Sequence, residues 1–94
     1  MKTAKQMERH FKGMANHYRV AMLLLIDAEA GILVEGIAER LQANYKTISQ
    51  HTRYLTQAGL VNKQYHGRAV RHFLSPYGKL FVRFIKSFQR VGSP

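Results

Sequence analysis

The sequence predicts a mainly α-helical domain of about five helices with one small β-hairpin. Several segments repeat apolar residues at intervals of three and four, which is the period of an amphipathic helix. Two short β-prone runs, residues 60–65 and 69–74, flank a turn that contains Gly67. With 94 residues, the chain is long enough for one domain with a single modest core. We therefore expect residues 1–94 to form one domain.

Two helices are expected in the first third of the chain, one at residues 3–15 and one from residue 16 or 17 to residue 28. The first has an apolar stripe with spacings of four and three residues, formed by Met7, Phe11 and Met14. The second is rich in leucine, which indicates burial on most sides. Gly31 then breaks the helical pattern, and residues 32–35 are expected to be a short extended or pre-helical piece.

A short helix and a longer one follow. The short helix, residues 34–42, has an apolar stripe formed by Val34, Ile37, Ala38 and Leu41. Asn44 is well suited to cap the next helix, residues 45–58, and Gly59 fits the C-terminal end of that helix.

Helix 45–58 combines a narrow apolar stripe with a polar side that contains no acid. At about 100° per residue, Ile48 and Leu55 point the same way. The opposite side consists of Lys46, Gln50, Arg53 and Gln57, bordered by Ser49 and Tyr54. Side chains of these types reach base edges and phosphates in a DNA groove. The helix is therefore a candidate for reading DNA, and a solvated polar face is the alternative.

The hairpin that follows completes a recognisable order of elements. In the run 69–74, Val70, His72 and Leu74 alternate with the residues between them, as in a half-exposed strand. A short helix, a tight turn and a helix with a groove-ready face make a helix-turn-helix, here residues 34–58. The basic hairpin, residues 60–74, then makes a wing of about two or three strands. The predicted fold is a winged helix-turn-helix.

The last expected helix is strongly amphipathic. Ser75 is suited to its N-cap and Pro76 to its first position. Its apolar stripe consists of Tyr77, Leu80, Phe81, Phe84, Ile85 and Phe88. Its opposite side consists of Lys79, Arg83, Lys86 and Arg90. Residues 92–94 are expected to be a frayed tail.

The charge is strongly positive and unevenly distributed. The chain has 15 Lys and Arg against 5 Asp and Glu, a net charge of +10. Residues 1–39 contain five basic and five acidic residues, whereas residues 40–94 contain ten basic residues and no acid. A basic field of this kind favours a polyanionic partner, either nucleic acid or an anionic membrane surface.

Several other classes of function find no support in the sequence. There is no Cys, which excludes disulfides, thiolate metal sites and a Cys nucleophile. The five histidines fall in no recognised metal-binding arrangement, and no nucleophile–base constellation or Gly-rich phosphate loop is visible. The first ten residues lack the apolar core of a secretory signal, and the run 20–26 is too short to span a bilayer. We expect no enzyme, no metal and no cofactor.

The segment "IAERLQANYKTISQHTRYLTQAGLVNKQYHGRAVRHFLSP" resembles the winged helix-turn-helix of the ArsR-type transcriptional repressors. The match covers about 40 residues, and its "S-x-H…L…AGLV" spacing is fairly specific for winged helices as a class. The matching residues are Ile37, Ala38, Leu41, Thr47, Ile48, Ser49, His51, Leu55, Ala58, Gly59, Leu60, Val61, Gly67, Arg68, Val70 and Leu74. The step "LSPYG" resembles the junction between wing and last helix in MarR-type regulators.

The resemblance implies a dimer formed through the first and last helices, which binds imperfect palindromes and releases DNA when a ligand shifts the dimer. This sequence departs from the family at Thr52, where a leucine is usual. The metal-sensing members use Cys near the third helix or Asp/His pairs on the first or last helix. This chain has no Cys, and its last helix has no Asp, Glu or His, so we expect no metal sensing of that kind. His51 is either a ligand or pH switch or a structural histidine bonded to a backbone carbonyl beside the turn, and the resemblance favours the structural role.

Candidate DNA contacts lie on helix 45–58 and on the wing. Lys46, Gln50 and Arg53 are expected on base edges or phosphates, because Arg or Lys pairs with guanine and Gln with adenine. Phosphate contacts are also expected from Thr47, Ser49 and Tyr54. The alternatives are that Thr47 serves the turn and that Tyr54 covers the core. The wing candidates are Lys63, His66, Arg68 and Arg71, with Arg68 able to enter a narrow minor groove.

The apolar stripes of the first and last helices suggest a homodimer. The expected interface consists of Met7, Phe11, Met14, Leu80, Phe81, Phe84, Ile85 and Phe88. An intramolecular core alone and a membrane-binding face are the alternatives.

The sequence thus predicts a transcriptional regulator that binds double-stranded DNA sequence-specifically and acts as a repressor. The expected location is the nucleoid in the cytoplasm of a prokaryote. The alternatives are a nonspecific architectural DNA-binding protein and a winged-helix module that binds RNA or protein.

Overall fold

The computed structural model describes residues 1–92 and has five helices and a two-stranded antiparallel sheet. The elements are α1 (Ala4–Met14), α2 (His17–Ala28), α3 (Val34–Leu41), α4 (Tyr45–Gln57), β1 (Val61–His66), β2 (Ala69–Leu74) and α5 (Pro76–Arg90). The predicted fold class, a winged helix-turn-helix, is confirmed. Of the expected frayed tail, residues 93 and 94 lie outside the described residues.

The helices begin where the local sequence supplies a cap. Asn16 accepts hydrogen bonds from the backbone of Tyr18 and Arg19, and Ser75 accepts one from Gly78. Thr3 and Gln6 form a capping box at the start of α1. These caps lie within one residue of the starts that the sequence predicts.

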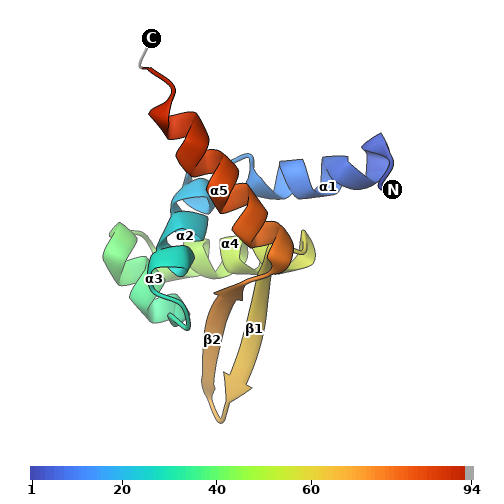
Figure 1. Cartoon of the computed structure of the whole chain (residues 1–94). Helices are drawn as coiled ribbons and strands as arrows, with labels where there is room; N and C mark the ends of the chain where they lie inside the picture. Colours follow the sequence, from blue (N-terminus) through green and yellow to red (C-terminus); the bar gives the residue numbers. More distant parts are fainter. Residues whose placement is uncertain (93–94) are drawn as a thin grey trace.

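The core lies around α2, which packs against α4, α5 and the hairpin (Figure 1). The fully buried apolar side chains come from α2, α3, α4 and the residue before β1, and are Met22, Leu23, Ile26, Ile37, Ile48, Leu55 and Leu60. The ribbon shows α5 crossing this body, the hairpin projecting from it, and α1 extending to one side (Figure 1). Because α2 packs against both α4 and the hairpin, the core holds these two elements in place relative to each other.

The wing is a two-stranded sheet with one additional bridge. β1 and β2 pair in a register that runs from Val61 opposite Leu74 to His66 opposite Ala69. Gly67 turns the chain with a φ of 61°, a left-handed conformation that glycine adopts without strain. An isolated antiparallel bridge joins Ile32 to His72, so the expected extended piece adds one residue to the sheet.

His72 lies on the buried side of β2, in agreement with the alternation expected along this half-exposed strand. Its side chain is completely buried, and its Nδ1 lies 2.9 Å from the carbonyl oxygen of Ile32. Nδ1 therefore carries the hydrogen and donates it, which leaves Nε2 as a buried atom with no partner among residues 1–92. Burial lowers the pKa of His72, and the nearby charge of Lys63 acts in the same direction.

We expect the free energy of unfolding to decrease as the pH falls through about 6.5, the ordinary pKa of histidine. Because the pKa of His72 is lowered in the folded state, the unfolded chain takes up the proton first. The contribution is thus complete above that pH and is lost below it. Urea unfolding between about pH 7.5 and pH 5 measures this slope. His72→Gln should flatten it, whereas His66→Gln at the exposed wing tip should not; equal slopes in all three proteins contradict the assignment.

Candidate nucleic-acid interface

One side of α4 is open to solvent along its whole length. Lys46, Gln50, Arg53 and Gln57 are all exposed and form what we call the polar face of α4. Thr47 and Ser49 beside it are half-buried, and Tyr54 is 46% exposed. The structure thus brings together all six residues that the sequence placed on this helix as DNA contacts.

The buried side of α4 explains how the helix is held. Ile48 and Leu55 are fully buried, and Thr52 is 2% exposed. The hydroxyl group of Thr52 donates to the carbonyl oxygen of Ser49 at 2.7 Å, so its polarity is satisfied inside the helix. The departure from leucine at this position therefore leaves no unpaired hydroxyl group in the core.

Asn44 positions the start of α4. Its side chain accepts hydrogen bonds from the backbone nitrogens of Lys46 and Thr47, at 2.8 and 3.3 Å. The turn before it is closed by Gln42 in a left-handed conformation, with a φ of 50°. The polar face begins immediately after this cap, where the helix dipole favours an anion.

Arg19 of α2 supports Tyr54, a contact that sequence reasoning missed. The guanidinium group of Arg19 lies over the Tyr54 ring, 4.1 Å from its centroid. The same group donates to the carbonyl oxygen of Lys12 at 3.2 Å and faces Nδ1 of His51 at 3.4 Å. Arg19 therefore ties three helices together and holds the Tyr54 ring at the edge of the polar face.

Within residues 1–92, His51 bonds a side chain and not a backbone carbonyl, which corrects the partner expected for it. Its Nδ1 accepts from Arg19, and its ring lies 5.5 Å from that of Tyr18. Burial lowers the pKa of His51, and the charges of Arg19 and His17 add to this effect. The neutral imidazole is the form that can accept from Arg19.

The wing residues divide into free and anchored groups. His66 and Arg68 are exposed at the tip, and Lys63 is half-buried on β1. Arg71 is exposed, but its Nη1 donates to the carbonyl oxygen of Gly31 at 3.2 Å, so it also fastens the wing to the α2–α3 loop. Tyr65, which is 71% exposed, is a further wing residue that the sequence analysis did not select.

The cations of this surface are not neutralised by neighbouring carboxylates. Within residues 1–92, the ion pairs involve Glu8, Asp27, Glu29 and Glu39, which lie on or next to α1, α2 and α3. No ion pair in that range includes Lys46, Arg53, Lys63 or Arg68. The polar face of α4 and the wing therefore both present cations that pair with no carboxylate in that range.

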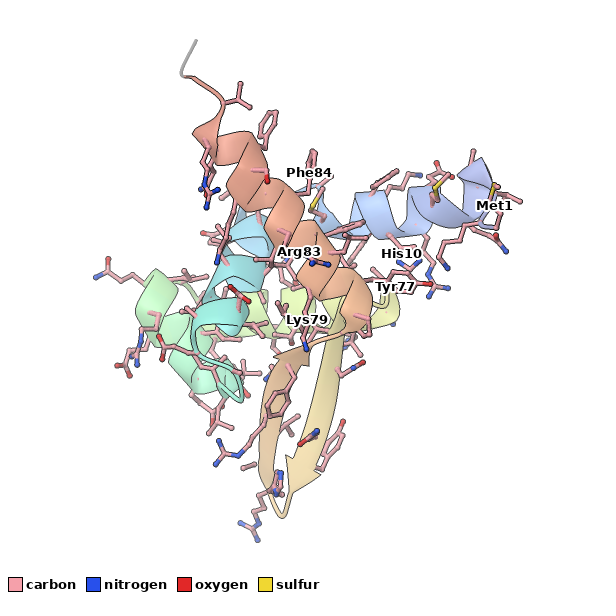
Figure 2. The ribbon with its side chains drawn as sticks, in the orientation of Figure 1. Met1, His10, Tyr77, Lys79, Arg83 and Phe84 are labelled. Carbon is pink, nitrogen blue, oxygen red and sulfur yellow. The ribbon has the colours of Figure 1, made fainter. Side chains whose placement is uncertain are left out.

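A second surface, formed by α1 and α5, is apolar. Phe11 is 53% exposed, Leu80 51%, Phe84 58% and Phe88 69%. A groove of about 760 Å³ runs between the two helices and is lined mainly by Phe11, Met14, Leu80, Phe81 and Phe84. Phe84 projects from α5 away from the wing (Figure 2). An exposed apolar patch of this kind marks an interaction surface.

Part of the expected dimer interface belongs to the chain's own fold. Ile85 is 7% exposed and lies in the core, which corrects its placement in the interface. Phe81 is half-buried and stacks on Phe11 of the same chain at 5.7 Å between ring centroids. Met14 also packs partly on the core, whereas Met7 is 38% exposed. The face left open to a partner consists of Met7, Phe11, Leu80, Phe84 and Phe88.

Among residues 1–92, no group of three or more His, Asp or Glu side chains is placed to hold a metal ion. In the same range, no helix combines the length and the apolar character needed to cross a membrane.

The arrangement defines a winged helix-turn-helix protein, and solved structures with this fold are similar to it. No family model and no curated protein sequence matches the chain. HlyU from Vibrio cholerae N16961 is 25% identical, with a TM-score of 0.82 over 93% of this chain and 95% of that one. A homodimeric winged helix-turn-helix DNA-binding domain from Mycobacterium bovis, Mb0332, is described as a possible ArsR-family transcriptional regulator. It is 25% identical, with a TM-score of 0.77 over 90% of this chain and 80% of that one.

The transcriptional repressor PagR of Bacillus anthracis shares the fold at 16% identity, with a TM-score of 0.78 over 86% of this chain and 93% of that one. The predicted resemblance to ArsR-type and MarR-type regulators is confirmed, since the similar structures are winged helix-turn-helix transcription regulators and include a possible ArsR-family regulator and a MarR family regulator.

Proposed function

We propose that this protein is a sequence-specific transcriptional regulator that binds double-stranded DNA with α4 in the major groove and the wing on the flanking backbone. The observation that carries the proposal is the exposed, acid-free polar face of α4. It presents Lys46, Gln50 and Arg53, whose side chains match base edges. The net charge of +10 supplies salt-dependent affinity for phosphates.

We further propose that the regulator is a homodimer. The support is the exposed apolar face on α1 and α5, which a second copy can cover by two-fold symmetry. The structurally similar domain from Mycobacterium bovis is itself homodimeric. A dimer places two α4 helices on two half-sites, so the preferred DNA should be an inverted repeat.

We propose repression as the mode of regulation and the nucleoid of a prokaryotic cytoplasm as its place. The support is the transcriptional repressor PagR of Bacillus anthracis, which has the same fold. Bound to an operator, such a dimer acts by occupying the site.

The division of labour between helix and wing gives a direct test. Lys46→Ala or Arg53→Ala should reduce the preference for the selected sequence over random DNA by about 1–3 kcal/mol, because base contacts are lost. Lys63→Ala should weaken binding to all sequences about equally and should reduce the salt slope by about 0.9, the value for one phosphate. Fluorescence anisotropy titrations on selected and random duplexes measure both quantities.

Equal losses on selected and random duplexes for all three variants contradict this assignment. In that case the protein binds DNA without sequence preference, and the polar face of α4 contacts phosphates and not bases. Tighter binding to RNA than to duplex DNA at physiological salt would instead indicate an RNA-binding winged helix.

A further inference from the structure

A basic stripe runs along α1 on the side opposite its apolar stripe. The α1 basic stripe consists of Lys2, Lys5, Arg9 and Lys12. The spacings of four and three residues place Lys5, Arg9 and Lys12 on one face of α1, roughly opposite Met7 and Phe11, and Lys2 precedes the N-cap residue Thr3. The apolar stripe thus faces the proposed dimer interface, and the basic stripe faces away from it.

The C-terminal half of α1 packs against the C-terminal end of α4. Gly13 of α1 is buried against Ala58, and a Cβ atom at Gly13 would lie 2.3 Å from the Cβ of Ala58. Nδ1 of His10 donates to the carbonyl oxygen of Ala58 at 2.7 Å, which satisfies a carbonyl group at the C-terminal end of α4. These two contacts join α1 to the C-terminal end of α4.

Arg9 connects the two surfaces. It lines a hollow of about 260 Å³ together with Lys12 of α1 and with Tyr54 and Gln57 of α4. It also lines a cleft of about 420 Å³ with Lys2, Lys5, His10 and Tyr77. Arg9 and Lys12 of α1 therefore lie beside Tyr54 and Gln57 at the C-terminal end of α4.

Two cations of the stripe have no carboxylate partner. Lys5 and Lys12 pair with Glu8, at 3.7 and 3.1 Å, and both pairs are exposed. Within residues 1–92, no ion pair includes Arg9 or Lys2, and Nζ of Lys2 lies 4.5 Å from the centroid of the Tyr77 ring. That ring also lies against His10, with 4.7 Å between centroids. His10 and Tyr77 thus line the cleft and add no carboxylate to it.

Two residues that line the cleft, His10 and Tyr77, lie on the side of α1 where the wing is (Figure 2). They lie next to each other beneath α1, whereas Phe84 points to the other side (Figure 2). A second copy seated on the apolar face therefore leaves the α1 basic stripe free.

We propose that the α1 basic stripe binds backbone phosphates of the DNA next to the half-site that α4 reads, an inference that rests on the proposed function. The guanidinium group of Arg9 offers two parallel donors to phosphate oxygens, and Lys2 offers a mobile point charge. From Lys5 to Lys12 the helix rises by about 10 Å, which matches the axial rise of about three nucleotides of one strand. A row of cations spaced along a helix suits a row of phosphates better than one small anion, which needs converging donors.

The test is the salt dependence of binding to the selected duplex by the double variant Lys2→Gln/Arg9→Gln. Loss of two phosphate contacts should reduce the slope of log K against log salt by about 1.8. Lys79→Gln/Arg90→Gln, which removes the same charge from α5, should keep the wild-type slope. Lys2→Arg/Arg9→Lys keeps both charges and should also keep it. Circular dichroism melting confirms that each variant folds.

An unchanged slope in Lys2→Gln/Arg9→Gln overturns the proposal, as does an equal decrease in the α5 control. Titration of pyrophosphate into the DNA-free protein, followed by the NMR signals of the His10 and Tyr77 rings, tests whether the cleft binds a free phosphate compound instead of DNA. Saturable pyrophosphate binding together with an unchanged DNA slope assigns the cleft to a free phosphate compound and overturns the DNA assignment. If the wild type prefers no sequence, the proposed function fails; if Arg53→Ala relaxes the preference and the slope stays unchanged, only the α1 assignment fails.

Discussion

Gly78→Ala is expected to destabilise the fold by about 3 kcal/mol, although the same change in an exposed helix stabilises by about 1 kcal/mol. A Cβ atom at Gly78 would lie 2.1 Å from the carbonyl oxygen of Leu60. That carbonyl group accepts from the backbone nitrogen of Ser75 at 3.0 Å, and the Ser75 hydroxyl donates to Gly59 at 2.6 Å. The end of α4 and the start of α5 are thus fastened together, so neither backbone can move away.

Urea unfolding monitored by circular dichroism measures this effect. Gln89→Ala, an exposed position on the same helix, serves as the control and should change the free energy of unfolding by less than about 0.5 kcal/mol. A Gly78→Ala protein as stable as the wild type contradicts the close approach of α5 to Leu60.

Leu80→Glu/Phe84→Glu is expected to convert the proposed homodimer into a folded monomer. Leu80 and Phe84 are 51% and 58% exposed, so the charges are solvated in the monomer and buried only in the dimer. Affinity for a duplex with two half-sites should fall by about 100- to 10,000-fold, because the second half-site is no longer bound as part of the same molecule. Analytical ultracentrifugation and anisotropy titrations measure the two effects.

Gln89→Glu adds a charge to α5 away from the apolar face and should leave the dimer intact. A wild-type protein that sediments as a monomer at micromolar concentration removes the basis of this prediction. A double variant that stays dimeric shows that the interface lies elsewhere.

The helices and the hairpin were predictable because their signals are local. Asn44 and Ser75 cap α4 and α5 through hydrogen bonds to backbone nitrogens two or three residues away. The polar face of α4 was predictable for the same reason, since a helical period fixes which side chains share a side. All four members of that face are exposed in the structure.

Contacts between distant segments were not predictable in this way. His72 is buried because Ile32, forty residues away in the sequence, bonds both its ring and its backbone. The support of Tyr54 by Arg19 depends on the packing of α2 against α4, which periodicity does not describe. A helical wheel also does not show which residues of an apolar stripe are buried in the chain's own core and which remain exposed for a partner. Ile85 and Phe84 are neighbours in sequence, yet one is buried and the other exposed.

Selection of binding sites from a random duplex pool at about 150 mM salt tests the central claim most directly, because nonspecific phosphate binding is already weak at that salt. We expect the selected duplexes to share two inverted half-sites about one helical turn apart, the spacing set by two α4 helices in a dimer. Binding of the pool without enrichment of any motif would contradict sequence-specific recognition by α4.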